Sequence, residues 1–259
     1  MTEYYKIARP DGWDFKTGET INYRDNIGKR VVDPQYQKGA RCCNAGVLHA
    51  SKDPLDALRW SKLPCSVYRV SGRPVDVRDD KAGFKSFRII EEIPESEFNE
   101  LFGFDYMRVV YPINPLEIDN EVTDVDIENL KEWISVGASA WDSVGNSVWA
   151  SVWASVGNSV GGSVGVSVWD SVGASAASVW DSVGNFVGNS VTAYIGSCFP
   201  GITDWKYMDH EPGEYPFQCG VDLWERGFIP LYLDGKWHLW KENGGIVYTL
   251  DHRPINREE

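Results

Sequence analysis

Residues 143–172 read SVGNSVWASVWASVGNSVGGSVGVSVWDSV, a strict repetition of the tetrapeptide Ser-Val-x-x. The same period begins at residue 135, slips by one position near Ala177 and then continues, so we assign the repeat to residues 135–196. Its third position is nearly always Gly or Trp, and no Lys or Arg occurs between Lys131 and Lys206. A fixed period this short has to be explained before the rest of the chain is interpreted.

Three structures could carry this repeat. A long α-helix has about 3.6 residues per turn, close to four, but each of its many glycines would cost about 1 kcal/mol relative to alanine. Disorder is a poor alternative, because five tryptophans and a valine in nearly every unit carry much apolar surface. A β-solenoid would point each valine inward and turn at the fourth residue, with coils stacked about 4.8 Å apart. We therefore predict a β-solenoid built from tetrapeptide repeats over residues 135–196, similar in logic to the coil of pentapeptide-repeat proteins.

The segments on both sides of the repeat contain signals for caps, which a solenoid needs to cover its exposed strand edges. On the N-terminal side, Thr123 and Asp126 have the spacing of a capping box, which predicts a capping helix at 119–134. On the C-terminal side, residues 197–259 predict a small α+β cap. Its expected elements are a helix at 215–225, a hairpin at 229–240 that turns at Asp234-Gly235, and a third strand at 246–250.

Residues 1–118 predict an α+β N-terminal head domain. A helix is expected after Ser51, whose hydroxyl can cap it, with Pro54 in its first turn, and a second short helix is expected at 95–101. The expected strands lie at 4–8, 47–50, 65–70, 84–93 and 107–111. The chain is thus expected to have four parts: the head domain 1–118, the capping helix 119–134, the solenoid 135–196 and the C-terminal cap 197–259.

The composition argues against several classes of protein. The chain has 259 residues and a net charge of −13, whereas proteins that bind a phosphate backbone concentrate Lys and Arg. No apolar stretch is long enough to span a bilayer, and the first residues do not read as a signal peptide. Five cysteines without CxxC spacing indicate a reducing cytoplasm rather than a disulfide framework or a zinc site. We expect no metal, no membrane contact and no nucleic-acid partner.

The head contains the segment Ala45-Gly-Val-Leu-His-Ala-Ser51, and several later segments accompany it. These accompanying segments are Ala57, Trp60, 70–72, 89–92 and 214–227. Together they are similar to an uncharacterised domain of phage and prophage proteins, which often carry short-period repeats downstream. The resemblance implies a phage- or prophage-encoded protein in the cytoplasm of an infected or lysogenic bacterial host, or in the virion. With a rigid repeat rod between globular ends, the expected function is interaction or assembly with a protein partner, either as a virion component or as a host-factor binder, and a homo-oligomer is an open alternative.

The run Gly46-Val-Leu-His-Ala-Ser51 also resembles the second motif of the ADP-ribosyltransferase fold, in which a strand is followed by a helix that packs beneath an NAD site. The resemblance implies that NAD is the cofactor, that His49 stacks on the nicotinamide and that Ser51 is its polar neighbour. It also implies that Glu91 or Glu92 is the catalytic acid that holds the ribose 2′-hydroxyl.

The first motif of that family, a His-Gly or an Arg on the first strand, has no clear counterpart in residues 6–9. His49 can also be interpreted as a core histidine, and Glu91-Glu92 as the solvated end of a strand. An ADP-ribosyltransferase-like enzyme, or a degenerate NAD-binding domain, is therefore the alternative to the interaction protein. This alternative predicts a dinucleotide-sized cleft between the strands 47–50 and 84–93.

Overall fold

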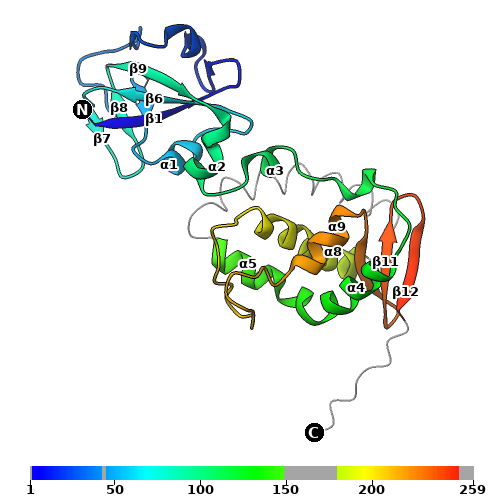
Figure 1. Cartoon of the computed structure of the whole chain (residues 1–259). Helices are drawn as coiled ribbons and strands as arrows, with labels where there is room; N and C mark the ends of the chain where they lie inside the picture. Colours follow the sequence, from blue (N-terminus) through cyan, green and yellow to red (C-terminus); the bar gives the residue numbers. More distant parts are fainter. Residues whose placement is uncertain (1, 43–44, 149–179, 251–259) are drawn as a thin grey trace. The chain divides into compact units, whose positions relative to one another are not determined.

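The structure is a computed structural model that describes residues 2–42, 45–148 and 180–250 (Figure 1). Its contacts divide the chain into two compact units, residues 1–106 and residues 107–259. We call them the head unit and the C-terminal unit, and describe each by itself.

The main sheet of the head unit has four antiparallel strands in the order β1-β6-β9-β4. The strands are β1 (Glu3–Ala8), β6 (Ser66–Ser71), β9 (Ser86–Ile93) and β4 (Arg30–Val32). In β9, Phe87 and Ile89 are buried whereas Ile90 is exposed, which is the alternation of a strand with one face on the core. The core on this face is rich in aromatic rings, which come from Tyr4, Tyr23, Tyr68, Phe84 and Phe87.

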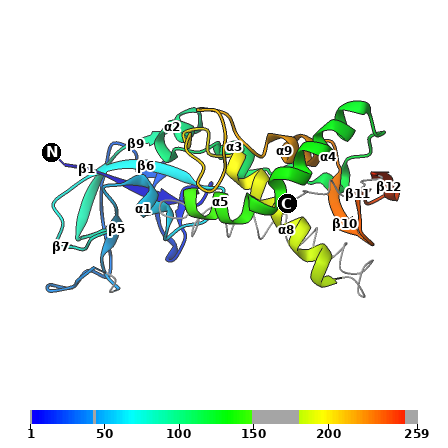
Figure 2. The same cartoon turned by 90° about the horizontal axis from the view of Figure 1, so that it is seen from below.

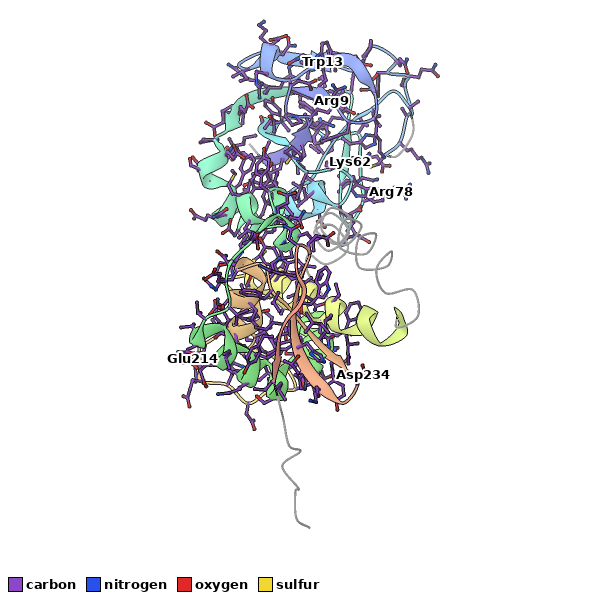
Figure 3. All side chains as sticks on the ribbon, turned by 90° about the vertical axis from the view of Figure 1, so that its right-hand side faces the viewer. Arg9, Trp13, Lys62, Arg78, Glu214 and Asp234 are labelled. Carbon is purple, nitrogen blue, oxygen red and sulfur yellow. The ribbon has the colours of Figure 1, made fainter. Side chains whose placement is uncertain are left out.

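Two small sheets complete the head unit. One is a hairpin of β2 (Trp13–Asp14) and β3 (Gly18–Asn22), and Arg9 and Trp13 flank the turn that leads into it from β1 (Figure 3). The other has the order β5-β8-β7, formed by β5 (Leu48–Ala50), β8 (Ala82–Phe84) and β7 (Asp76–Val77). Backbone hydrogen bonds of 2.7 and 3.0 Å between Tyr5 and Ser51 join β1 to the end of β5.

The helices of the head unit are short. They are η1 (Arg24–Asn26), α1 (Pro54–Leu58), η2 (Glu95–Glu97) and α2 (Phe98–Phe102). The cap of α1 is Asp53 rather than Ser51, since the Asp53 carboxylate accepts a hydrogen bond of 2.8 Å from the Leu55 N–H. Tyr106 ties the end of the unit to the start of β6, because its hydroxyl accepts a 2.9 Å hydrogen bond from the Cys65 N–H.

In the residues that the structure describes, the C-terminal unit combines helices with one antiparallel sheet in the order β10-β11-β12. Its helices are α3 (Tyr106–Val110), η3 (Pro115–Glu117), α4 (Asp124–Val136), η4 (Gly137–Ser139), α5 (Ala140–Val148), α8 (Trp180–Ser197) and α9 (Gln218–Glu225). Its strands are β10 (Ile229–Leu233), β11 (Lys236–Lys241) and β12 (Gly245–Leu250).

Two local predictions for the C-terminal unit are confirmed. At the start of α4, the Asp126 carboxylate accepts hydrogen bonds from the Thr123 N–H (2.8 Å) and hydroxyl (2.7 Å), which completes the capping box. At the β10–β11 turn, Asp234 and Gly235 both have positive φ angles, 51° and 77°, as a type I′ turn requires.

The β-solenoid predicted for residues 135–196 is wrong. The described parts of the repeat are helical, with α5 over its early units and α8 over its last units (Figure 2). The sheets formed by the described residues are small, antiparallel and separate, and none is a solenoid coil. Residues 149–179, the middle of the predicted solenoid, lie outside the described residues. The strand expected at 107–111 is also wrong, because α3 occupies most of it.

The packing of the two helices explains why the repeat is helical at its ends. A period of four places every fourth residue near the same face of a helix. The buried residues accordingly follow this spacing, with Ala140, Val144 and Val148 in α5 and Val187, Val191 and Ile195 in α8. Most helix stability in proteins comes from burying such an apolar face, and this burial offsets the cost of the glycines.

The buried position of the Trp133 indole in α4 depends on two glycines. Its indole is buried, and a Cβ added at Gly220 of α9 or at Gly137 would overlap this ring. The close approach of α4 and α9 therefore requires a residue without a side chain at position 220.

We expect Gly220→Ala to lower the free energy of unfolding by about 1–3 kcal/mol, because the new methyl group overpacks against Trp133. The matched control is Gly188→Ala in α8, where no described atom other than its chain neighbours and the nearby backbone of its own helix lies within 4 Å of the added Cβ. That change should raise the free energy of unfolding by up to about 1 kcal/mol. Urea unfolding of the full chain measures both, and equal effects of the two changes would contradict the packing.

Candidate functional site

The head unit contains a cavity of about 480 Å³. Its walls come from β1, the β2–β3 hairpin, the loop after β4, β5 and α1, together with Lys81 just before β8. Small-molecule sites in proteins usually have about 300–1,000 Å³, so this cavity has the size of a ligand site.

His49 of β5 adds an imidazole to the cavity wall. Leu48, His49 and Ala50 all line the cavity, and His49 is half-buried whereas its two neighbours are buried. The chain reaches β5 through Gly46, which has a φ of 86° and approaches the Gln35 carbonyl so closely that a Cβ would collide with it. Only glycine combines this φ angle with this approach, so Gly46 sets the position of the wall that holds His49.

The surroundings of His49 keep its imidazole neutral. Burial and the positive charges of Lys6, Lys81 and Lys16 lower the pKa of His49 to about 4, against an opposing contribution from Asp14. At neutral pH the ring is therefore uncharged and can stack on, or hydrogen-bond to, a ligand without repelling a cationic group.

An ion pair forms part of the cavity wall. Lys6 Nζ on β1 lies 2.5 Å from Asp14 Oδ2 on β2. Asp14 also accepts hydrogen bonds from the Lys16 N–H (2.8 Å), the Thr17 N–H (3.2 Å) and the Tyr23 hydroxyl (3.2 Å). Burial would raise the pKa of Asp14, but the charge of Lys6 and these hydrogen bonds hold it well below its usual range. Asp14 is thus a fixed carboxylate inside the cavity.

A tryptophan and two lysines gather at one part of the lining. Trp60, which follows α1, is about half exposed, and its indole N–H donates a 2.9 Å hydrogen bond to the Asp80 carboxylate. Lys81 Nζ lies 3.6 Å from the centre of the indole ring, and Lys16 Nζ lies 5.5 Å from it. Trp60, Lys16 and Lys81 line the cavity, whereas Asp80 lies outside the lining.

The structure brings together two of the four residues that the sequence singled out. His49 and Ser51 both line the cavity. Glu91 and Glu92 lie on β9, and none of the described residues that line the cavity belongs to that strand. Each glutamate is engaged elsewhere, because Glu92 pairs with Arg24 at 2.6 Å and Glu91 pairs with Arg69 at 3.1 Å.

Sequence reasoning missed Lys6, Asp14 and Lys81 as site residues. Lys6 is the cationic side chain that the first strand supplies to the cavity, at the segment where no counterpart of an arginine was recognised. Asp14 precedes the turn at Lys16-Thr17-Gly18, where its carboxylate accepts two backbone hydrogen bonds. An acidic residue before such a turn is the signal that could have indicated the hairpin.

Among the described residues, no group of three or more His, Cys, Asp or Glu side chains could hold a metal ion. The four described cysteines are buried. Within the same part of the chain, no helix has both the length and the apolar character needed to cross a membrane.

Comparisons of the chain with protein-family models, with curated proteins and with solved structures find no match.

We expect the His49 imidazole to titrate with a midpoint near pH 4 in NMR spectra of the full chain, with the signal assigned through His49→Gln. An unfolded histidine takes up its proton near pH 6.5, so the protonated unfolded state is favoured as the pH falls from 6.5 towards 4. The stability that neutral His49 contributes is fully present above pH 6.5 and is lost through that window. Lys81→Gln should move the midpoint upward, because it removes a nearby positive charge. A midpoint near 6.5 in the unchanged protein would contradict the proposed environment.

Proposed function

We propose that the head unit is a ligand-binding domain that holds a dinucleotide of the NAD class in the cavity beside His49, and that it binds this ligand without transferring ADP-ribose. The observation that carries the proposal is that one cavity is lined by His49 of β5, by Ser51 directly after that strand, and by Lys6 and Asp14 of β1 and β2. The resemblance of residues 46–51 to the ADP-ribosyltransferase motif supplies the class of ligand.

The residues of the cavity suit a nicotinamide ring. The oxidised nicotinamide carries a positive charge, and a neutral imidazole at His49 can stack on it without repulsion. Tyr5, Phe15 and Trp60 add aromatic walls, while Ser51 and Lys6 offer hydrogen-bonding groups for an amide. The cavity thus combines apolar walls with a few polar groups, as is usual for small-molecule sites.

The position of the acids favours binding over transfer. NAD offers a nicotinamide–ribose bond that can be cleaved when a free carboxylate stabilises the developing positive charge on the sugar. Glu91 and Glu92, the acids expected for this role, pair with arginines away from the cavity lining. Asp14 does line the cavity, but its charge is already balanced by Lys6. The site therefore has the features of a binding pocket and lacks a free acid among the residues expected to supply one.

The interaction or assembly role expected from the sequence depended on a rigid solenoid rod. Because the described ends of the repeat are helices, a solenoid rod no longer supports a role in interaction or assembly. The phage or prophage setting and a protein partner stay predictions.

Calorimetric titration of the full chain with NAD tests the proposal. We expect saturable binding, and we expect His49→Asn to weaken it about three- to tenfold, because an aromatic contact contributes about 0.5–1.5 kcal/mol. His49→Phe keeps a ring and should retain most of the affinity.

The matched control is Glu91→Gln, which should leave NAD affinity unchanged because Glu91 is outside the cavity lining. Circular dichroism of each variant verifies folding. Absence of binding to the unchanged protein at millimolar NAD would refute the proposal. Equal affinity of the His49→Asn variant would refute the placement of the ligand beside His49.

A further inference from the structure

The three lysines that line the cavity differ in their partners. Lys6 is paired with Asp14. Lys16 and Lys81 have no carboxylate within 4 Å of their ammonium groups among the residues that the structure describes, and both lie against the indole of Trp60. Two cationic groups are therefore left available at one part of the cavity lining.

Trp60 and Asp80 hold these cations in place. The hydrogen bond from the indole N–H to the Asp80 carboxylate fixes the ring, and Lys81 rests 3.6 Å from the ring centre. A lysine on an aromatic face gains a cation–π interaction and loses part of its freedom before any ligand arrives. The backbone N–H of Lys16 donates to Asp14, which fixes the start of its side chain, and its ammonium group lies 5.5 Å from the centre of the Trp60 ring. Preorganised charges of this kind bind an anion with less loss of side-chain entropy than free surface lysines.

The charge of the head unit also differs from that of the whole chain. Residues 1–106 contain 17 Lys and Arg and 17 Asp and Glu, whereas residues 107–259 contain 8 and 21. The net charge of −13 thus belongs to the C-terminal unit, and the head unit is neutral. Inside the cavity, Lys6 and Asp14 balance each other, which leaves Lys16 and Lys81 against Asp33. The charges of the lining residues alone therefore sum to a net positive charge, which favours an anionic group, whereas the Asp80 carboxylate beside Trp60 lies outside the lining and opposes it.

We propose that Lys16 and Lys81, held beside Trp60, form a phosphate subsite of the cavity that binds the diphosphate of the dinucleotide. This inference rests on the proposed function, and it adds the residues that select a phosphorylated ligand over a free nicotinamide. Lysine is a common phosphate ligand, and two ammonium groups near one ring can each donate to a different phosphate oxygen. His49 lines the same cavity as both lysines, so one ligand in that cavity can contact the imidazole and the cations.

Binding measurements on the full chain with four probes test the subsite: NAD, ADP-ribose, inorganic diphosphate and nicotinamide. We expect Lys16→Gln and Lys81→Gln each to weaken NAD and ADP-ribose about five- to tenfold, and the double variant to weaken them more than either. Nicotinamide affinity should change by less than about twofold, because it has no phosphate. Raising the salt concentration should weaken NAD binding to the unchanged protein more than to the double variant.

The matched control is Lys85→Gln. Lys85 also lies near an aromatic ring, 5.4 Å from the centre of Tyr36, but it does not line the cavity, so its loss should leave all four affinities unchanged. Lys81→Arg keeps the positive charge that contacts the phosphate, so this variant should retain the NAD affinity that Lys81→Gln loses.

The failure of this inference can be separated from the failure of the proposed function. If NAD binds and His49→Asn weakens it, but the lysine variants and salt have no effect, then the phosphate subsite is refuted and the proposed function stands. If NAD does not bind, but inorganic diphosphate binds and the double variant abolishes that binding, then the proposed function is refuted and the subsite stands. If neither NAD nor diphosphate binds, both are refuted.

Discussion

The site of the head unit depends on two backbone hydrogen bonds between Tyr5 and Ser51. These bonds join the first strand of the main sheet to the end of β5, which belongs to a different sheet. Because Lys6 follows Tyr5 and His49 precedes Ser51 by two residues, the same two bonds bring a cationic side chain and an imidazole to one cavity. The hydrogen-bonded backbone therefore fixes the relative position of residues that are more than forty positions apart in the chain.

The ion pair of Lys6 and Asp14 is a second constraint on the cavity, and forming it costs desolvation free energy. Removing two charges from water is unfavourable, and the pair can be retained only when its remaining polar atoms have partners. Asp14 meets this condition through two backbone N–H groups and the Tyr23 hydroxyl. The pair secures the β2–β3 hairpin against β1, and this position makes the hairpin a wall of the cavity. A structural role for the pair and a polar contact with a ligand are compatible, since both require the same fixed geometry.

Local signals predicted local structure well, and the repeat shows where they fail. The capping box at Thr123 and the turn at Asp234-Gly235 were predicted correctly because each depends on a few adjacent residues. The repeat was assigned to a solenoid because the intrinsic cost of glycine in a helix was weighed without the tertiary packing. In α5, the buried stripe of Ala140, Val144 and Val148 supplies the missing contribution. Intrinsic propensity is a weak guide where a helix can bury a continuous apolar face.

The residues of the candidate site likewise fall into two groups, those that a local motif could predict and those that only strand pairing brings together. His49 and Ser51 were found because they lie two residues apart, in β5 and directly after it, where a local motif can place both. Lys6, Asp14 and Lys81 come from three other segments, and only the pairing of strands brings them to the cavity. Glu91 and Glu92 were assigned to the site from their position in the sequence, yet the register of β9 places them opposite Arg69 and Tyr68 of β6. The net charge of the whole chain was equally uninformative about the site. The excess of acidic residues lies in residues 107–259, whereas the head unit is neutral. The net charge, which argued against a partner with a phosphate backbone, therefore gives no information about the cavity, where three lysines and two aspartates contribute to the local potential.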